Sequence, residues 1–375
     1  MGVPRTSSTA TAGDPRVDEI FDEGHWAGSG ESLDSGGHGL RPTACGASLR
    51  RPPPLTGWLA PRMASQAPHT TIQRPSSGPS DGGVAAVVVT HNRRASLEQC
   101  LDALAAQTRR VDEVLVVDNA SSDGTAELLR TRSGSVRVET LQENTGGAGG
   151  FRHGLARAHV LGYEWIWLMD DDTIPRPDAL AALLAAERVI RSRVPETLVL
   201  ASRVIWTDGR LHPMNQPRPK TSWPELVAAA ELGYLPLRAA SFVSLLVHRR
   251  AIDVNGLPHG YYFVWNDDLE YTARLLRAGR GFWIPASVVE HRTSEPYTAA
   301  TSDGARFYFD VRNRLFMMRS NAWSGREKLQ LARHLEANVR RYLLANRLGR
   351  AAVRTVVRGA RDGLRPPRGG DGDGR

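Results

Sequence analysis

The sequence contains few cysteines, few lysines and no long apolar run. Cys45 and Cys100 are the only cysteines in 375 residues. They are too few for a disulfide framework and fit no metal-binding motif, which is consistent with a reducing cytoplasm. No apolar stretch reaches the roughly 18–20 residues of a transmembrane helix, and the N-terminus lacks the apolar core of a signal peptide. We therefore expect neither a secreted disulfide scaffold nor an integral membrane protein.

The positive charge of the chain is concentrated near its C-terminus. The net charge is +8, and residues 321–375 contain thirteen Lys and Arg against five Asp and Glu, which accounts for the whole excess. In residues 325–360 arginines alternate with Leu and Val at helical spacing, which predicts basic amphipathic helices. Such helices suit an anionic membrane surface, or they pack on the domain with a solvated basic face. Nucleic acid is a weaker alternative, because the chain contains no recognised nucleic-acid-binding module.

Composition divides the chain into three segments. Residues 1–83 are rich in Gly, Ser, Pro, Thr and Arg and show no sustained periodicity, so we predict a disordered tail. Met63 is an alternative start of the natural chain. Residues 84–320 show the alternating apolar pattern of a folded domain. Residues 321–375 are predicted to form a basic helical segment with a disordered end.

Strands and helices alternate in the first half of the folded domain. We predict strands at 84–90, 111–117, 136–140 and 165–169, and helices at 96–107, 126–132 and 151–161. Units of this length favour an α/β fold with a parallel sheet and crossover helices, in which ligands bind beyond the C-terminal strand ends. Later strands are predicted at 198–205, 241–248 and 283–291, where the pattern becomes more α+β.

Three consecutive carboxylates follow the buried strand at 165–169. In an extended chain residues i and i+2 point the same way, so Asp170 and Asp172 can converge while Asp171 points elsewhere. Hard oxygen ligands suit Mg²⁺ or Mn²⁺, which complete their coordination with substrate phosphates. The alternative is an acidic N-cap, at Asp172 or Thr173, of a helix near residues 177–187.

A second acidic group, Asp267, Asp268 and Glu270, is predicted to open a helix at 269–277 that ends at Gly279. N-capping explains one acid at such a position, and this segment has three. His291 ends the last predicted strand; a single histidine of this kind is more often structural than functional.

Residues 84–315 resemble the inverting glycosyltransferases of the GT-A fold, family 2. Five motifs occur in the order of that family, at 88–93, 117–125, 170–172, 265–271 and 306–315. The resemblance implies a Rossmann-like nucleotide-sugar-binding domain with a mostly parallel sheet, followed here by a C-terminal helical segment. The stretch 144–151 is similar to the galactofuranosyl- and rhamnosyltransferase branch, especially the actinobacterial galactofuranosyltransferases of cell-wall galactan. The length from Met63 to the end fits the enzymes that begin the galactan.

The resemblance also assigns roles to individual residues. It implies donor contacts from eight residues, namely Thr90, Arg93, Asp118, Asn119, Asn144, Gly146, Gly147 and Asp171. It implies Mn²⁺ or Mg²⁺ bound by Asp170, Asp172 and His291, and Asp268 as the catalytic base. Acceptor-side candidates are Trp265, Asp267 and Glu270, of which the two acids are alternatively orienting groups. Many members have Asp where this chain has Asn119. The difference weakens the inference that the nucleobase of the donor is uracil.

The activity implied is transfer of galactofuranose from UDP-galactofuranose to a rhamnosyl-GlcNAc-diphospho-polyprenol in arabinogalactan synthesis, at the cytoplasmic face of the plasma membrane. The alternative within the class is a dTDP-rhamnose-dependent rhamnosyltransferase. A further alternative, an inactive nucleotide-sugar-binding scaffold, disagrees with the retention of every acid. The glycines at 146–150 are expected to form a flexible loop that lets the backbone approach the donor. They are not a P-loop, because no Gly-Lys-Ser/Thr follows them.

Overall fold

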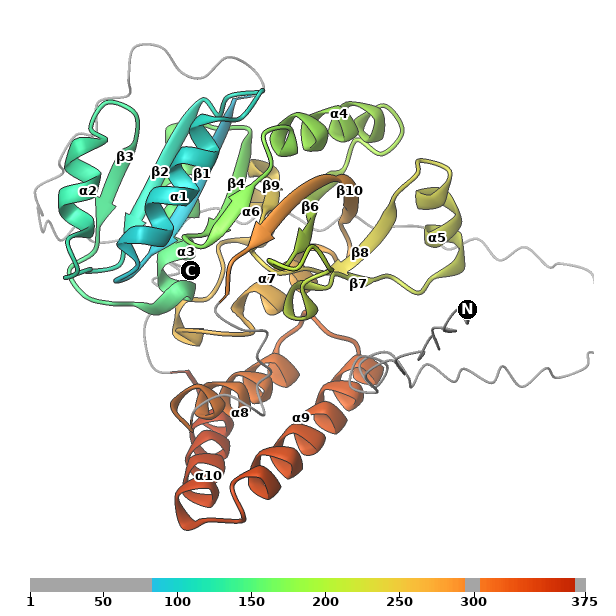
Figure 1. Cartoon of the computed structure of the whole chain (residues 1–375). Coiled ribbons are helices and arrows are strands. Elements are labelled where there is room, and N and C mark those ends of the chain that lie inside the picture. Colours follow the sequence, from blue (N-terminus) through green and yellow to red (C-terminus); the bar gives the residue numbers. More distant parts are fainter. Residues whose placement is uncertain (1–82, 294–303, 368–375) are drawn as a thin grey trace, which may run out of the picture. The chain divides into compact units, whose positions relative to one another are not determined.

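The structure, a computed structural model, describes residues 83–293 and 304–367 (Figure 1). All of these residues belong to one compact unit, residues 71–375. Of the tail 1–83, for which we predicted disorder, only Gly83 is described, and it is buried with its carbonyl hydrogen-bonded to Glu164 and Trp165. The rest of the tail, the suggested start at Met63 and the end at 368–375 lie outside the described residues.

A ten-stranded sheet organises the domain, with the order β3-β2-β1-β4-β9-β6-β10-β8-β7 and with β5 paired to β10. Its first half is parallel, as predicted, and consists of β1 (Val84–Thr90), β2 (Glu113–Asp118), β3 (Arg137–Thr140) and β4 (Trp165–Asp170). Because these strands run in the same direction, their C-terminal ends meet at one edge.

The second half of the sheet is mixed, which agrees with the change of pattern seen in the sequence. Here β10 runs parallel to β6, and the other pairings are antiparallel. The strands are β5 (Thr173–Pro175), β6 (Thr197–Ile205), β7 (Arg218–Pro219), β8 (Leu235–Ala239), β9 (Leu245–His248) and β10 (Arg280–His291).

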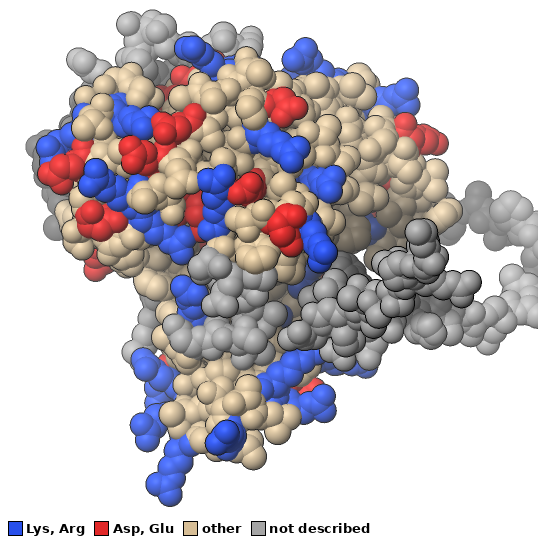
Figure 2. All heavy atoms as spheres, viewed as in Figure 1, with Lys and Arg blue, Asp and Glu red and all other residues tan. Residues whose placement is uncertain are grey.

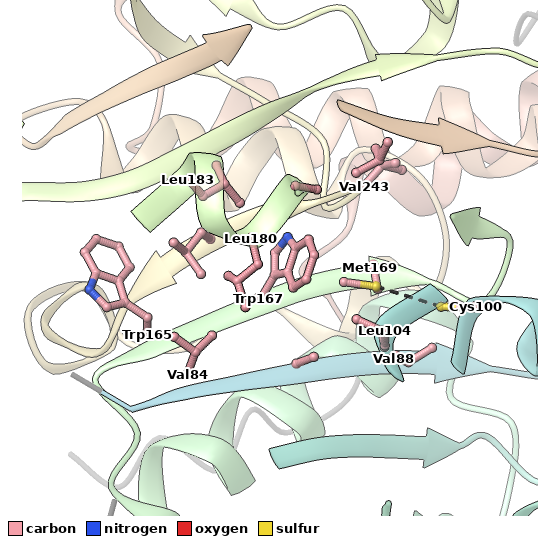
Figure 3. Packing of buried hydrophobic residues seen from close by; sticks show 14 of the residues in the cluster. Val84, Val88, Cys100, Leu104, Trp165, Trp167, Met169, Leu180, Leu183 and Val243 are labelled. Atoms are coloured by element: carbon pink, nitrogen blue, oxygen red, sulfur yellow. Dashed lines mark hydrogen bonds between the residues drawn. The ribbon is translucent and has the colours of Figure 1, made fainter. Parts of the chain in front are cut away.

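Helices cover both faces of the sheet, and β4 is buried between two apolar layers. Trp165, Trp167 and Met169 pack on one side, against α1 (Arg94–Ala105) and α4 (Ala179–Arg191) (Figure 3). Ile166 and Leu168 pack on the other side, with α3 (Gly146–Leu161), α6 (Arg249–Asn255) and α7 (Asp267–Leu275). Alternate residues point to opposite faces, so a continuous apolar run is what a doubly covered strand requires. Two shorter helices, α2 (Thr125–Thr131) and α5 (Trp223–Ala230), complete this part.

Three boundaries differ from the sequence prediction. The helix predicted at 151–161 begins at Gly146, so the glycines form its first turns. The residues after Asp172 form β5 instead of a helix start, and α4 begins only at Ala179. Helix α7 ends at Leu275 with Leu276 as its C-cap, not at Gly279. Asp172 favours a helix N-cap locally, but the pairing of β5 with β10 keeps the residues after it in a strand.

The C-terminal helices are α8 (Gly304–Arg319), α9 (Gly325–Ala345) and α10 (Arg350–Leu364) (Figure 1). A capping box at Ser324 and Glu327 starts α9, and the rings of Phe307 and Tyr342 stack at 3.8 Å between α8 and α9. The arginine Arg312 of α8 also donates to the backbone of Tyr261. Helix α8 thus contacts both the sheet domain and the last two helices, and the predicted domain boundary at 320/321 stays a prediction.

Lys and Arg side chains gather over the part of the molecule that contains α9 and α10, whereas both signs are mixed over the sheet domain (Figure 2). The predicted helical character of this segment is confirmed. Among the helices of the described ranges, none combines the length and apolar character of a transmembrane segment.

Candidate active site

The C-terminal ends of β1, β2 and β4 bring predicted site residues together. Thr90 is level with Asp118 of β2, and Val89 is level with Asp170 of β4. The Thr90 hydroxyl donates a hydrogen bond of 2.8 Å to Asp171 Oδ2. Asp118 Oδ1 accepts a 3.0 Å hydrogen bond from the Ser121 backbone, which shapes the turn after β2. Asp171 is thus fixed by Thr90, and it lies with Asp172 in a turn after β4 rather than in the extended chain that the prediction assumed.

Asp170, Asp172 and His291 form a cluster in which one ligand atom of each lies within 4.8 Å of the others. The pairing of β5 with β10 places His291 level with Thr173, which brings the ring to the carboxylates. His291 Nε2 lies 3.0 Å from Asp172 Oδ1, and Nδ1 lies 2.8 Å from Asn215 Oδ1. The amide oxygen of Asn215 accepts from Nδ1 and leaves Nε2 directed at the carboxylates. The capping alternative for Asp172 is wrong, since the N-cap of α4 is Asp178.

The electrostatics of this cluster fit a divalent cation. Burial, with added repulsion from Asp172, raises the pKa of Asp170 to about 6. Burial raises the pKa of Asp171 to about 7, against the nearby Arg93 charge. Burial also disfavours ionised Asp172, but the hydrogen bond and charge of His291 prevail and hold its pKa near 2. Asp170 ionises reluctantly without further positive charge, whereas Asp172 ionises readily; together with the imidazole nitrogen of His291 they are a donor set that Mn²⁺ or Mg²⁺ fits.

Arg93 extends the cluster toward solvent. Its Nη1 donates to Asp172 and lies 3.8 Å from Asp171, while half of the side chain (49%) remains exposed. An open depression of about 600 Å³ adjoins it, lined in part by Asn92 and Asp123. The guanidinium thus lies where a bound anion could share it with the carboxylates.

Asn119 and Asn144 both hold the first turn of α3. Asn119 Nδ2 donates to Gly146 O at 2.8 Å, and its Oδ1 accepts from the Thr145 backbone at 2.8 Å. Asn144 Oδ1 accepts from the Gly146 backbone at 2.8 Å. A carboxylate in place of Asn119 could accept from Thr145 but could not donate to Gly146. This pairing explains why an amide occupies the position, whereas its contact with a nucleotide base stays a prediction.

Gly146 lies where α3 meets the segment that precedes α7. Its φ is +72°, and a Cβ there would lie 2.0 Å from Phe263 O. The Ala148 backbone donates to the same carbonyl at 3.1 Å. Gly147 lies in the same turn, and a Cβ on it would have no atom within 4 Å. The expectation of a flexible glycine loop is therefore corrected: these glycines belong to an ordered helix, and Gly146 permits a close backbone contact.

Gly146→Ala is expected to lower the free energy of unfolding by at least about 2 kcal/mol, because the substitution adds a left-handed backbone strain to a steric overlap. Urea unfolding measures the change. Gly147→Ala is the matched control and should leave stability equal or slightly higher, since alanine favours helix. Equal effects of the two substitutions would contradict the close contact at Phe263.

The segment just before α7, which leads into Asp267 and Asp268, has a strained backbone. Phe263, Trp265 and Asn266 all have φ between 65° and 67°, which is unusual for non-glycine residues. Asp268 Oδ1 accepts from the Leu269 backbone at 2.7 Å. Burial raises the pKa of Asp268 to about 6; the Leu269 bond opposes this shift and the Asp170 charge adds to it. The two acids are therefore close enough for the charge of Asp170 to add to the raised pKa of Asp268.

The remaining acceptor-side candidates differ in exposure. Asp267 is buried, and burial with repulsion from Asp268 raises its pKa well above the usual range. Glu270 is 1% exposed and pairs with Arg274 at 3.1 Å and with Ser320 at 2.9 Å. These contacts favour an orienting role for Glu270. Trp265 is partly buried at the left-handed turn.

Two asparagines and an arginine that support the site were missed by sequence reasoning. Asn313 Nδ2 donates to the carbonyls of Tyr262, Val264 and Trp265 at 2.7–3.0 Å. Arg312 donates to Tyr262 O at 2.7 Å. Both lie in the motif at 306–315, which was identified without assigning residues. Asn215, which orients His291, carried no motif signal.

Comparison with known proteins agrees with this geometry. The family model Glycosyl transferase family 2 matches residues 85–188. Galactofuranosyltransferase GlfT1 of Mycolicibacterium smegmatis is 29% identical over 260 residues, which are 63% of this chain and 82% of that protein. The GlfT1 of Mycobacterium tuberculosis is 34% identical over 215 residues, 53% of this chain and 66% of the relative.

Other relatives extend the family. Undecaprenyl-phosphate mannosyltransferase of Micrococcus luteus is 32% identical over 231 residues, 56% of this chain and 86% of the relative. The crystal structure of S. aureus TarS 1-349 in complex with UDP-GlcNAc matches with a TM-score of 0.52 and 16% identity. That match covers 75% of this chain and 80% of the other, and it supports the fold alone. This chain is thus a GT-A glycosyltransferase that belongs to glycosyl transferase family 2.

Proposed function

We propose that this enzyme transfers galactofuranose from UDP-galactofuranose to a rhamnosyl-GlcNAc-diphospho-polyprenol acceptor in cell-wall arabinogalactan synthesis. The observation that carries the proposal is the arrangement of two acidic groups: the cluster of Asp170, Asp172 and His291, and Asp268 at the start of α7. The segment before α7 contacts the first turn of α3, which Asn119 ties to the same sheet edge. Similarity to two galactofuranosyltransferases supports the choice of sugar.

On the donor side, Asp170, Asp172 and His291 would hold Mn²⁺ or Mg²⁺, which would neutralise charge on the departing diphosphate when bound. Arg93 places its half-exposed guanidinium next to the same carboxylates. Thr90 fixes Asp171, and the first turn of α3, with Asn144, Gly146 and Gly147, borders the same edge of the sheet.

On the acceptor side, Asp268 removes the proton from the attacking hydroxyl. A single base suffices for inversion, because no covalent sugar–enzyme bond has to form and break. Asp267 and Glu270, both buried, hold the start of α7. Trp265 lies next to this turn as a contact for the acceptor sugar.

The pKa of Asp268 predicts the acid limb of the pH profile. A base acts only when deprotonated, so kcat/KM should fall about tenfold per pH unit below roughly pH 6. A cation at Asp170 would shift this limb to lower pH, because it cancels the repulsion that raises the Asp268 pKa. An activity that rises on acidification through this range would contradict the assignment.

We also propose that α9 and α10 dock on the anionic inner face of the plasma membrane. Lys and Arg side chains gather over these helices (Figure 2). Apolar side chains are exposed on the same helices, including Leu344, Val353, Val357 and Leu364. The protein should sediment with phosphatidylglycerol vesicles and be released by salt, while phosphatidylcholine vesicles retain little. Equal binding to both lipids would contradict an electrostatic contribution.

The test of the function is turnover with a synthetic rhamnosyl-GlcNAc-diphospholipid and Mn²⁺, with UDP-galactofuranose and dTDP-rhamnose supplied in parallel. Product from UDP-galactofuranose alone, abolished by EDTA, is expected. Product only from dTDP-rhamnose would replace the galactofuranosyl function with the rhamnosyl one. The inactive-scaffold alternative would be supported if UDP-galactofuranose bound but neither donor gave product.

A further inference from the structure

A group of basic side chains lies near the start of α7 and has no role in the chemistry described above. It consists of Arg218 in β7, Arg314 in α8, and His334 and Arg341 in α9, here named the basic cluster. On α9, His334, Asn338 and Arg341 are four and three residues apart, so they share one face of the helix.

Hydrogen bonds show that this face of α9 is turned toward the start of α7. Asn338 Nδ2 donates to Asp310 Oδ2 of α8 at 3.3 Å. The other oxygen of Asp310 accepts from Asn266, the N-cap residue of α7, at 3.4 Å. Arg314 donates to the same Asp310 oxygen at 2.8 Å. Asp310 therefore joins α9, α8 and the residue two positions before Asp268.

Arg218 is connected to the start of α7 through β8. It pairs with Ala239, the next backbone N–H donates to Thr272 Oγ1 at 3.1 Å, and that hydroxyl donates to Asp268 O at 2.7 Å. Arg218 is half-buried, and burial lowers its pKa, with a further decrease from Arg314 and an opposing increase from Asp268. Within the described ranges, no carboxylate oxygen lies within 4.0 Å of its guanidinium. A partly exposed guanidinium without a carboxylate partner is a binding group for an anionic ligand.

The charges of the basic cluster are only partly compensated. Asp310 pairs with Arg314, whereas Arg341, like Arg218, has no carboxylate within 4.0 Å in the described part of the chain. Burial lowers the pKa of His334, and the neighbouring arginines lower it further, so its ring is a neutral hydrogen-bonding group. The side chains together offer an anion two guanidinium groups and an imidazole.

The chain also links the basic cluster to the candidate metal site. Asn215, which binds His291, precedes Arg218 by three residues. Three residues span at most about 10 Å of extended chain. Arg218 therefore lies within about 10 Å along the chain of the residue that orients His291, and β8 connects it to the start of α7.

We propose that the basic cluster binds the diphosphate group of the lipid-linked acceptor and so directs the acceptor sugar to Asp268. The proposal rests on the proposed function for the nature of the acceptor. Arg218 acts on Asp268 through its charge without forming an ion pair with it.

Binding is measured by calorimetry on the full chain with three probes: UDP, rhamnosyl-GlcNAc-diphospho-farnesol, and the same disaccharide as a neutral octyl glycoside. Arg218→Gln should weaken binding of the diphosphate-bearing acceptor about 10- to 100-fold, the loss expected for a charge-assisted hydrogen bond. Binding of the neutral glycoside and of UDP should not change. Arg341→Gln should also weaken binding of the diphosphate-bearing acceptor, but by a smaller factor, because Arg341 is exposed.

Arg188→Gln is the control, because Arg188 is exposed on α4 and the substitution removes the same charge. An equal loss for both acceptors would mean that Arg218 acts only on Asp268 or on the fold, and would overturn the proposal. If Arg218→Gln weakened the binding of UDP alone, the basic cluster would belong to the donor site. Wild-type protein that binds the diphosphate acceptor tightly but transfers no galactofuranose would contradict the proposed function and leave this inference intact.

Discussion

Asp268→Asn is expected to lower the turnover number roughly 10²–10⁴-fold while UDP-sugar binding persists. The amide is nearly isosteric with the carboxylate and can still accept the hydrogen bond from the Leu269 backbone. It cannot accept a proton from the acceptor hydroxyl. Donor binding should survive because the candidate metal ligands and Arg93 lie on other elements, β4, β10 and the turn after β1. Turnover and donor affinity are measured on the same preparation.

The matched control is Asp178→Asn. Asp178 is exposed at the N-cap of α4 and makes no side-chain cap hydrogen bond, so its loss of charge should leave turnover unchanged. Near-normal turnover of Asp268→Asn would refute its role as the base. Asp267→Asn should then be tested as the next candidate, although the strongly raised pKa of Asp267 makes it a poor base.

His291→Ala is expected to raise the Mn²⁺ concentration needed for half-maximal activity by about 100-fold or more. Loss of a residue that only hydrogen-bonds to a metal ligand costs about 10–100-fold in metal affinity. His291 contributes a donor atom itself, so its loss should cost more. Removing the ring also removes the main partner that lowers the pKa of Asp172. That carboxylate then ionises less readily, so competition by protons adds to the loss.

Mn²⁺ binding by electron paramagnetic resonance provides a readout that does not depend on activity. His153→Ala is the control, since His153 lies half-exposed on α3 and pairs with Glu139. The result that would contradict the assignment is Mn²⁺ affinity in His291→Ala equal to that of the wild-type protein.

Much of the sheet domain could be predicted from the sequence because its signals are local. The apolar run 165–169 is buried on both faces, and such a run predicts a covered strand whatever its partners. The start of α3 could not be predicted in this way. Four glycines in five residues oppose helix by propensity, but contact with Phe263 and the hydrogen bonds of Asn119 stabilise the turn. Those contacts are 26 or more residues away in sequence.

The site shows the same division between local and long-range signals. Asp170, Asp172 and Asp268 were predicted because their motifs are short and acidic, and His291 followed from the resemblance. Asn215, Asn313 and the basic cluster act through contacts that only the fold creates, such as the pairing of Asn215 with His291 across 76 residues. Arg218 lies in a proline-rich connection, where nothing in the sequence indicates that it faces Asp268.

The measurement that tests the central claim most directly is the anomeric configuration of the product, determined by nuclear magnetic resonance after transfer from UDP-galactofuranose. One base at Asp268, with the donor diphosphate held at Asp170, Asp172 and His291, predicts a single displacement and a product of inverted configuration. A product that retains the configuration of the donor would require a covalent nucleophile and would contradict the account of this site.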